Sequence, residues 1–107
     1  MEMLDALEAF ASLSQETRLR VFKLLIEYGD DGRLPGKIAG ALKIPDNTLS
    51  FHLSHMSKAG LVTSKKEGRS ITYYANCELI EDLIGFMQKN CCVRQKTKPR
   101  SCASKVC

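Results

Sequence analysis

The sequence of residues 35–60 is PGKIAGALKIPDNTLSFHLSHMSKAG, and it decides the fold of the chain. The spacing of its apolar residues predicts one helix over residues 36–43. It predicts a second helix that Asp46 caps and that Gly60 ends. A short helix, a tight turn and a second helix of about three turns form the pattern of a helix-turn-helix.

The residues that follow, 61–76, have the sequence LVTSKKEGRSITYYAN. Two β-prone runs flank a polar tip at Glu67 and Gly68, and this arrangement predicts a β-hairpin. A hairpin directly after a helix-turn-helix is typical of the wing of a winged-helix domain. The fold class that we expect is therefore mainly α with a small β-hairpin, a winged helix-turn-helix.

Three further amphipathic segments surround this unit. Residues 2–13 have apolar side chains at helical spacing, residues 15–28 form a helix that Ser14 would cap, and Asn76 would cap a last helix through about residue 90. The chain would then have about five helices. The apolar faces of these three would be Leu4, Leu7, Phe10 and Ala11, then Leu19, Phe22, Leu25 and Ile26, and finally Leu79, Ile80, Leu83, Ile84 and Met87.

The first and last predicted helices are more apolar than the core of one 107-residue chain needs. Their second faces would be buried against a symmetry mate, which predicts a two-fold homodimer. The alternative is that both helices simply cover the core of a monomer. The homodimer is the interpretation that we favour.

Length and composition limit the class of protein. A chain of 107 residues, 44% apolar and 26% charged, has the size and composition of one globular domain. Its apolar runs are far too short to cross a membrane. The first residues carry acids where a secretory signal carries bases, so we expect a cytoplasmic protein whose five cysteines are thiols.

The net charge of +4 is unevenly distributed along the chain. Residues 1–32 hold three bases and seven acids, residues 33–75 seven bases and two acids, residues 76–92 one base and three acids, and residues 93–107 five bases and no acid. A basic centre between acidic flanks is the footprint of a surface that faces phosphates. We therefore expect nucleic acid as a partner, and a two-fold dimer would match an inverted repeat in DNA.

The second helix of the helix-turn-helix has two distinct sides. At about 100° per residue, Leu49, Leu53 and Met56 form its buried stripe. The other side carries small polar residues and a lysine, which suit the major groove because amide and hydroxyl groups pair with base edges. The candidate DNA contacts on this side and at its borders are Asn47, Thr48, Ser50, Phe51, Ser54, His55 and Lys58.

Two residues of this helix allow alternative interpretations. Phe51 points away from the predicted core, so it either packs on a thymine methyl group or folds back onto the hairpin. His52 lies beside the apolar stripe, where a half-buried histidine with a local hydrogen bond is more common than a base or phosphate contact. We retain His52 as a candidate DNA contact beside that interpretation.

The hairpin contributes three cations, Lys65, Lys66 and Arg69. At the tip of a wing they would contact phosphates and set the register on DNA without recognising its sequence. The alternative is an ordinary solvated charged surface. Their position next to a helix-turn-helix favours the phosphate contacts.

Four of the five cysteines lie at or after the end of the last predicted helix, and they are Cys91, Cys92, Cys102 and Cys107. Adjacent cysteines are poor ligands for structural zinc, which prefers C-x₂₋₄-C spacings. Thiolates select soft ions, and three of them suit trivalent arsenic or antimony, which keeps one face for its lone pair. The neighbouring bases would favour the thiolate form. Oxidation-prone thiols or a redox pair are the alternative, and Cys77 is expected to be a small packed residue.

The third ligand is not decided by the spacing. We predict a site of Cys91, Cys92 and Cys102, with Cys107 as the alternative third ligand, because loop entropy separates the two by only about 0.4 kcal/mol. Residues 1–92 would form the DNA-binding and dimerisation domain. Residues 93–107 would form a basic, cysteine-containing flexible tail.

Four stretches of the chain carry a family resemblance: LSQETRLRVFKLL at residues 13–25, TLSFHLSHMSKAGLV at 48–62, EGRSITYYA at 67–75 and NCC at 90–92. With them, residues 4–92 resemble the ArsR/SmtB family of bacterial metalloregulatory repressors. The resemblance implies a dimer built by the first and last helices. It also implies a recognition helix in the major groove, a hairpin that straddles the backbone, and release of DNA when a toxic ion binds.

Within that family the chain is similar to arsenite-responsive members whose ligands lie at the end of the last helix. This similarity assigns Cys91 and Cys92 together with one tail cysteine. The best-known arsenite and cadmium sensors carry cysteines in the third helix, where this chain has LPGKIAGAL. Zinc sensors use histidines on the last helix, whereas both histidines here precede the hairpin. Neither of those sites is supported.

We therefore expect a homodimeric repressor that arsenite, or antimonite, releases from operator DNA, with no organic cofactor. One alternative is a repressor for methylated trivalent arsenic, which needs only two thiols. Others are a repressor that responds to another soft metal or to redox state, and a thiol-buffering or redox protein whose winged helix mediates protein contacts. We do not expect an enzyme, because the sequence shows no activated nucleophile and no phosphate loop.

Overall fold

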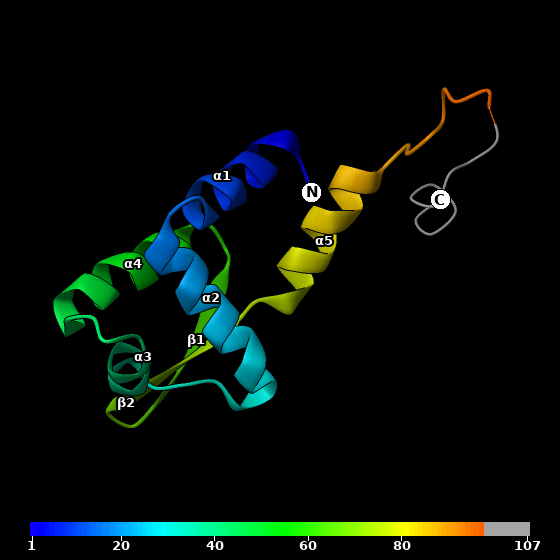
Figure 1. The fold of residues 1–107 in the computed structure, drawn as a ribbon. Helices are drawn as coiled ribbons and strands as arrows, with labels where there is room; N and C mark the ends of the chain where they lie inside the picture. The colour runs from blue at the N-terminus through cyan, green and yellow to red at the C-terminus, as the bar shows by residue number, and fades with distance from the viewer. Residues whose placement is uncertain (98–107) are drawn as a thin grey trace.

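The computed structural model describes residues 1–97, and residues 98–107 lie outside the described part. Residues 1–97 form five α-helices and one antiparallel two-stranded sheet (Figure 1). The expected fold class, a winged helix-turn-helix that is mainly α with a small β-hairpin, is confirmed. In chain order the elements are α1 Met3–Leu13, α2 Glu16–Tyr28, α3 Pro35–Leu42, α4 Asp46–Lys58, β1 Val62–Glu67, β2 Ser70–Ala75 and α5 Cys77–Gln88.

Side-chain caps explain where α2 and α5 begin. The side chain of Gln15 accepts the backbone N–H of Arg18 at 2.8 Å and caps α2. Ser14 was the expected cap of α2, but it is the C-cap of α1, and its backbone N–H donates to the carbonyl of Phe10. At α5 the prediction is confirmed, because the Asn76 side chain accepts the backbone N–H of Leu79 at 3.2 Å.

Asp46 was the predicted N-cap of the recognition helix α4. In the structure Asp46 is the first residue of the helix and Pro45 is its N-cap, so α4 begins one residue earlier than predicted. Its end is as predicted: Gly60 has a φ of +80°, in the left-handed region that favours glycine. The backbone N–H of Leu61 then bonds to the carbonyl of Met56, and that of Gly60 to the carbonyl of Ser57, both at 3.0 Å. This is the Schellman pattern, and it directs the chain into the hairpin.

The hairpin pairs Val62 with Ala75 at its base and Glu67 with Ser70 at its tip. Arg33, in the connection between α2 and α3, adds a third segment, because its backbone N–H and carbonyl each bond to Tyr73 at 2.9 Å. A Cβ on Gly32 would lie 2.7 Å from the Tyr73 carbonyl oxygen, so the close approach requires glycine. The wing is therefore attached to the helical body and does not extend from it alone.

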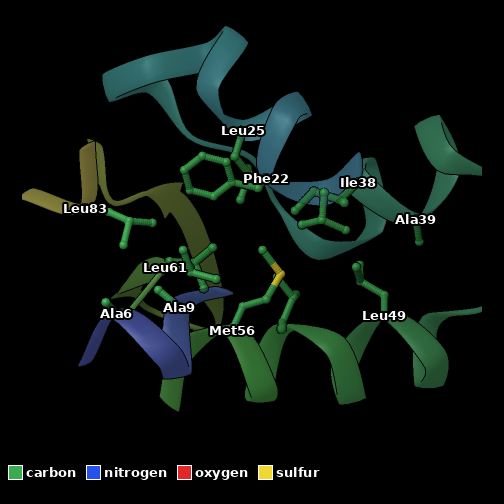
Figure 2. Packing of buried hydrophobic residues seen from close by; sticks show 13 residues of the cluster. Ala6, Ala9, Phe22, Leu25, Ile38, Ala39, Leu49, Met56, Leu61 and Leu83 are labelled. Atoms are coloured by element: carbon green, nitrogen blue, oxygen red, sulfur yellow. The ribbon is translucent and has the colours of Figure 1, made fainter. Parts of the chain in front are cut away.

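The core lies between α2, α3 and α4, and small residues of α1 close one end of it (Figure 2). Leu83 of α5 reaches this core from the side. The largest fully buried side chains include Leu25, Ile38, Leu49, Met56 and Leu61. Among residues 1–97, no helix combines the length and the apolar character that crossing a membrane requires.

The apolar face predicted for α1 is wrong. Its larger side chains point outward, and this exposed set is Leu4, Leu7, Phe10 and Ala11. The helix instead buries the small residues Ala6, Ala9 and Ser12. Small side chains allow α1 to approach its neighbours closely, so the helix turns its bulky residues away from the protomer. A similar exchange occurs in α2, where Val21 is buried while Leu19 and Ile26 are exposed.

Helix α5 also exposes apolar residues that were predicted to be buried. Of its five predicted apolar residues only Leu83 is buried, and Leu79 and Ile80 are partly buried. Ile84 and Met87 are 51% and 64% exposed. The apolar outer face, as we call it below, consists of Leu4, Leu7, Phe10, Ile84 and Met87. The helix also ends at Gln88, slightly earlier than expected, because Lys89 is extended and Asn90 has a φ of +64°.

Candidate nucleic-acid interface and thiol site

The outer face of α4 matches the sequence prediction. Its buried stripe is Leu49, Leu53 and Met56, and the helix is held against the core by it. The predicted contacts that lie on the opposite, exposed side are Asn47, Thr48, Ser50, Phe51, Ser54 and Lys58. The structure thus presents a row of small polar groups with one aromatic ring and one lysine to solvent.

Phe51 is 66% exposed and lies toward α1. It lines a hollow of about 570 Å³ to which Glu8 and Ala11 of α1 also contribute. Its ring meets the His52 ring edge-on, with 5.5 Å between centroids. Of the two predicted alternatives, an outward aromatic ring describes the structure, and folding back onto the hairpin does not.

His52 lies on the inner side of α4, away from the exposed side that carries most of the other candidate DNA contacts. The residue is only 8% exposed, and its Nδ1 accepts a hydrogen bond from Nη1 of Arg18 at 3.2 Å. Burial lowers the pKa of His52 from its ordinary value of 6.5, and the positive charges of Arg18 and His55 lower it further. The interpretation as a half-buried histidine with a local hydrogen bond is the correct one.

The corner between α1 and α2 contacts α4 at two points. Nε of Arg18 donates to the carbonyl oxygen of Ser12 at 2.7 Å, and the Ser12 hydroxyl lies 3.0 Å from Nδ1 of His55. Ser12 is fully buried and His55 is partly buried. Sequence reasoning missed Ser12 and Arg18, because each lies more than thirty positions from its histidine partner. The only signal was a histidine next to an apolar stripe.

All three predicted wing cations, Lys65, Lys66 and Arg69, are exposed. Nζ of Lys65 lies 3.7 Å from a carboxylate oxygen of Glu67, and both side chains are about 70% exposed. An exposed pair of this kind contributes only about 0–1 kcal/mol. A phosphate therefore competes with Glu67 for Lys65 at little cost.

The thiols of Cys91 and Cys92 lie just beyond α5, with 3.3 Å between their sulfur atoms. Cys91 is partly buried and Cys92 is exposed. Beyond the end of α5, residues 90 and 92 both have left-handed backbone conformations, with φ of 64° and 62°. Within residues 1–97, no group of three or more His, Cys, Asp or Glu side chains is placed to hold a metal ion. The predicted third ligands, Cys102 and Cys107, lie outside the described residues.

The exposed polar face of α4, the short helix α3 before it and the cationic hairpin after it together define a winged-helix DNA-binding protein. Comparison with known proteins agrees with this class. Residues 13–65 match the model of a helix-turn-helix domain family. An HTH-type transcriptional regulator of Methanocaldococcus jannaschii is 38% identical over 84 residues, which are 78% of this chain and 92% of the relative.

Two further comparisons narrow the family. The transcriptional repressor SdpR of Bacillus subtilis is 30% identical, over 73% of this chain and 83% of the relative. The structure of an ArsR-like transcriptional regulator from Rhodococcus sp. RHA1 is similar with a TM-score of 0.72 and 27% identity, over 80% of this chain and 78% of that one. The chain belongs to the ArsR family of winged helix-turn-helix transcriptional regulators. It is a DNA-binding regulator of transcription.

Proposed function

We propose that the protein is a homodimeric repressor that leaves its operator when trivalent arsenic binds the thiolates of Cys91 and Cys92. A third thiolate would come from Cys102 or, as the alternative, from Cys107. The observation that carries the proposal is the pair of sulfur atoms 3.3 Å apart directly after α5. Antimonite, which has the same lone-pair chemistry, would act at the same thiols.

The spacing of the two sulfur atoms is compatible with binding of one ion by both thiols. For metal–sulfur bonds of about 2.3 Å, two sulfurs on a tetrahedral ion lie about 3.8 Å apart, whereas bonds near a right angle place them about 3.3 Å apart. The observed separation of 3.3 Å is close to the second value. A trivalent ion with a lone pair has such compressed angles, so two thiols this close need little rotation to bind it.

The surroundings of the pair favour reaction with a soft ion. Cys92 is exposed, so an ion has direct access to it. Arg94 and Lys96 follow within four residues and are exposed. Nearby positive charge favours thiolate over thiol and so increases the reactivity of a cysteine.

The apolar outer face supports the homodimer. Leu4, Leu7 and Phe10 of α1 and Ile84 and Met87 of α5 are 40–65% exposed in the single chain. Burying a large apolar side chain stabilises a complex by about 1.5–3 kcal/mol. A two-fold contact would bury each of these residues twice, which gives a clear driving force for association.

The thiol pair is placed where binding would affect the dimer. Capturing an ion would order the residues after Cys92 and reset the last turn of α5, which is a dimer helix in this proposal. The two recognition helices of a dimer must lie about 34 Å apart, which is one turn of the DNA duplex. A changed dimer would misplace them, and about 1–3 kcal/mol of coupling weakens DNA binding 5–150-fold. The repressor relative from Bacillus subtilis supports repression as the direction of control.

The proposal is tested by titrating arsenite into a complex of the protein with a labelled fragment of its own promoter, followed by fluorescence anisotropy. We expect arsenite to release the wild type and to have no effect on the Cys91→Ser/Cys92→Ser double variant. Cys77→Ser is the matched control, because Cys77 is also exposed but lies at the opposite end of α5. It should respond like the wild type. Normal release of the double variant would refute the site.

The third ligand is tested separately with Cys102→Ser and Cys107→Ser. X-ray absorption at the arsenic edge counts the sulfur neighbours directly. We expect three neighbours in the wild type and two in whichever single variant lacks the third ligand. Two neighbours in the wild type and full induction of both variants would instead support the alternative repressor for methylated arsenic.

A further inference from the structure

The recognition helix is tied to the rest of the protomer by a polar contact as well as by its buried stripe. Arg18, at the start of α2, donates through Nε to the Ser12 carbonyl at 2.7 Å and through Nη1 to Nδ1 of His52 at 3.2 Å. One guanidinium therefore joins the end of α1 to the middle of α4. His52 is 8% exposed, so this contact is largely shielded from water.

The chemistry of the guanidinium determines the protonation state of the ring. Arginine only donates hydrogen bonds, so Nδ1 of His52 must accept and must carry no proton. The ring is therefore neutral with its proton on Nε2. A doubly protonated ring would place an N–H group and a positive charge directly against the guanidinium, and the contact would be lost.

The neighbouring contact between His55 and Ser12 behaves differently. A serine hydroxyl both donates and accepts, so the 3.0 Å contact with Nδ1 of His55 can form with either charge state of that ring. The two histidines thus form similar contacts with the same corner of the fold. Only the contact of His52 depends on a neutral ring.

Apolar packing and directional hydrogen bonds contribute differently to the rotation of α4. Burial of Leu49, Leu53 and Met56 is non-directional, whereas hydrogen bonds require particular distances and angles. Base recognition needs the outer face of α4 to be aimed into the groove, because base edges are contacted by hydrogen bonds with their own geometric demands. A directional contact on the inner side of the helix is therefore suited to set its orientation.

We propose that Arg18 is a positioning residue for DNA binding: it holds α4 in its groove-entering orientation through the neutral ring of His52, and protonation of that ring releases α4 and weakens the DNA complex. The proposal concerns DNA binding alone. It holds whether or not arsenic is the inducer.

The sign of the pH effect separates this role from direct contact with DNA. The charged groups that face His52 are Arg18 of α2 and His55 of α4, and with burial they lower the pKa of the ring. DNA affinity should fall once the pH drops below that pKa, by up to about tenfold for each pH unit, because binding must then expel one proton. A phosphate-contacting histidine predicts the opposite, since its protonation would strengthen binding.

The test compares the wild type with His52→Asn. The Oδ1 atom of asparagine accepts a hydrogen bond near the position of Nδ1 and does not titrate in this range. Dissociation constants for a labelled fragment of the protein's own promoter are measured by anisotropy from about pH 8 to about pH 5, a range that spans the ordinary histidine pKa. Ionic strength is kept constant because salt alone changes DNA affinity.

We expect the ratio of the wild-type dissociation constant to that of His52→Asn to rise as the pH falls. Parallel pH profiles of the two proteins, or a ratio that falls, would overturn the proposal. His55→Asn leaves the contact between Arg18 and His52 in place, so its profile should keep the acid-side loss. The midpoint should move to higher pH, because the His55 charge that lowers the pKa of His52 is removed. Circular dichroism at each pH confirms that the proteins are folded where affinities are compared.

Two further measurements do not depend on that variant. Nitrogen NMR of the wild type should show the His52 ring protonated on Nε2 and bare on Nδ1, and the reverse tautomer would contradict the contact. Arg18→Lys keeps the charge but loses the forked geometry, so it should weaken DNA binding about tenfold, the value of one hydrogen bond to a charged group. Arg20→Lys, on the exposed side of α2, should have no such effect.

Discussion

Helices α4 and α5 have nearly the same length, 13 and 12 residues, but they are held in very different ways. Helix α4 buries four side chains, including His52, and α5 buries one, Leu83. The orientation of α4 is therefore set within the protomer by packing and by the contact with Arg18. Helix α5 packs less extensively, because Leu79 and Ile80 are only partly buried against the core and Ile84 and Met87 stay exposed. In the proposed function, this weaker packing of α5 is what would allow an ion bound at its end to shift the helix.

The largest effect should come from disrupting the dimer contact that we propose for the exposed apolar side of α5. Ile84→Arg places a charge in the apolar outer face, and we expect it to remove about 3–6 kcal/mol from a dimer that buries two copies of Ile84. Sedimentation velocity at micromolar protein should then show monomer. Leu19→Arg, an equally exposed apolar position on α2, should remain dimeric like the wild type. A dimeric Ile84→Arg would show that α5 is not the interface.

The next effect concerns the packing that α4 already has. Met56 is fully buried in the core (Figure 2). Met56→Ala should lower the free energy of unfolding by about 2–5 kcal/mol, because it removes apolar contacts and leaves a cavity. Urea denaturation at fixed protein concentration measures this. The exposed neighbour Ser57→Ala should change it by no more than about 0.5 kcal/mol. Equal effects at both positions would mean that the buried stripe does not hold α4.

A smaller effect should appear when the pH is lowered. The pKa of His52 is lower in the folded protein than its ordinary value of 6.5, so below pH 6.5 the unfolded chain binds a proton that the folded chain does not. Stability from this group is complete above pH 6.5 and falls as the pH drops toward the folded-state pKa, by at most about 1.4 kcal/mol for each pH unit. Urea denaturation across this range should show the loss in the wild type, and His52→Asn should reduce it. An unchanged slope in the variant would assign the pH dependence to other groups.

The smallest effect concerns the salt dependence of DNA binding, which should respond to a lysine on α4 and not to one beside α5. Lys58 lies on the exposed side of α4, and Lys89 is exposed just after α5. Lys58→Ala should weaken promoter binding uniformly across sequences and reduce the slope of log K against log salt by about 0.9, the value for one phosphate contact. Lys89→Ala should leave the slope unchanged. Equal slopes for both variants would mean that α4 does not face the DNA backbone at Lys58.

The fold was predictable because its local signals agree with one another. The stripe of α4 at Leu49, Leu53 and Met56 is buried as predicted, and Gly60 and Asn76 act as helix boundaries. The stripe of α1 was predicted with the wrong inner side. Periodicity shows that a helix is amphipathic, but it does not show whether its large apolar residues face the core or a second molecule.

The candidate site was predictable in part for the same reason. Exposure of the polar side of α4 and of the wing cations follows from helical and strand periodicity, so it was predictable, and the contacts of these residues with DNA stay a prediction. The inward position of His52 was not found, because its partner Arg18 is 34 residues away and only the tertiary fold brings the two together. Of the predicted thiol site, Cys91 and Cys92 are adjacent in the chain and hence in space, and a tail ligand remains a prediction.

The amino-acid sequence by itself determined the order of helices and hairpin, the identity of the recognition helix and the clustering of thiols at one end, because all of these depend on neighbours within a few residues. Only the tertiary structure decided which side of α1 and α5 is left bare, and which histidine is held by Arg18. Those features depend on contacts between segments far apart in the chain. Hydrophobic packing and hydrogen bonds select such contacts only when the whole domain has folded.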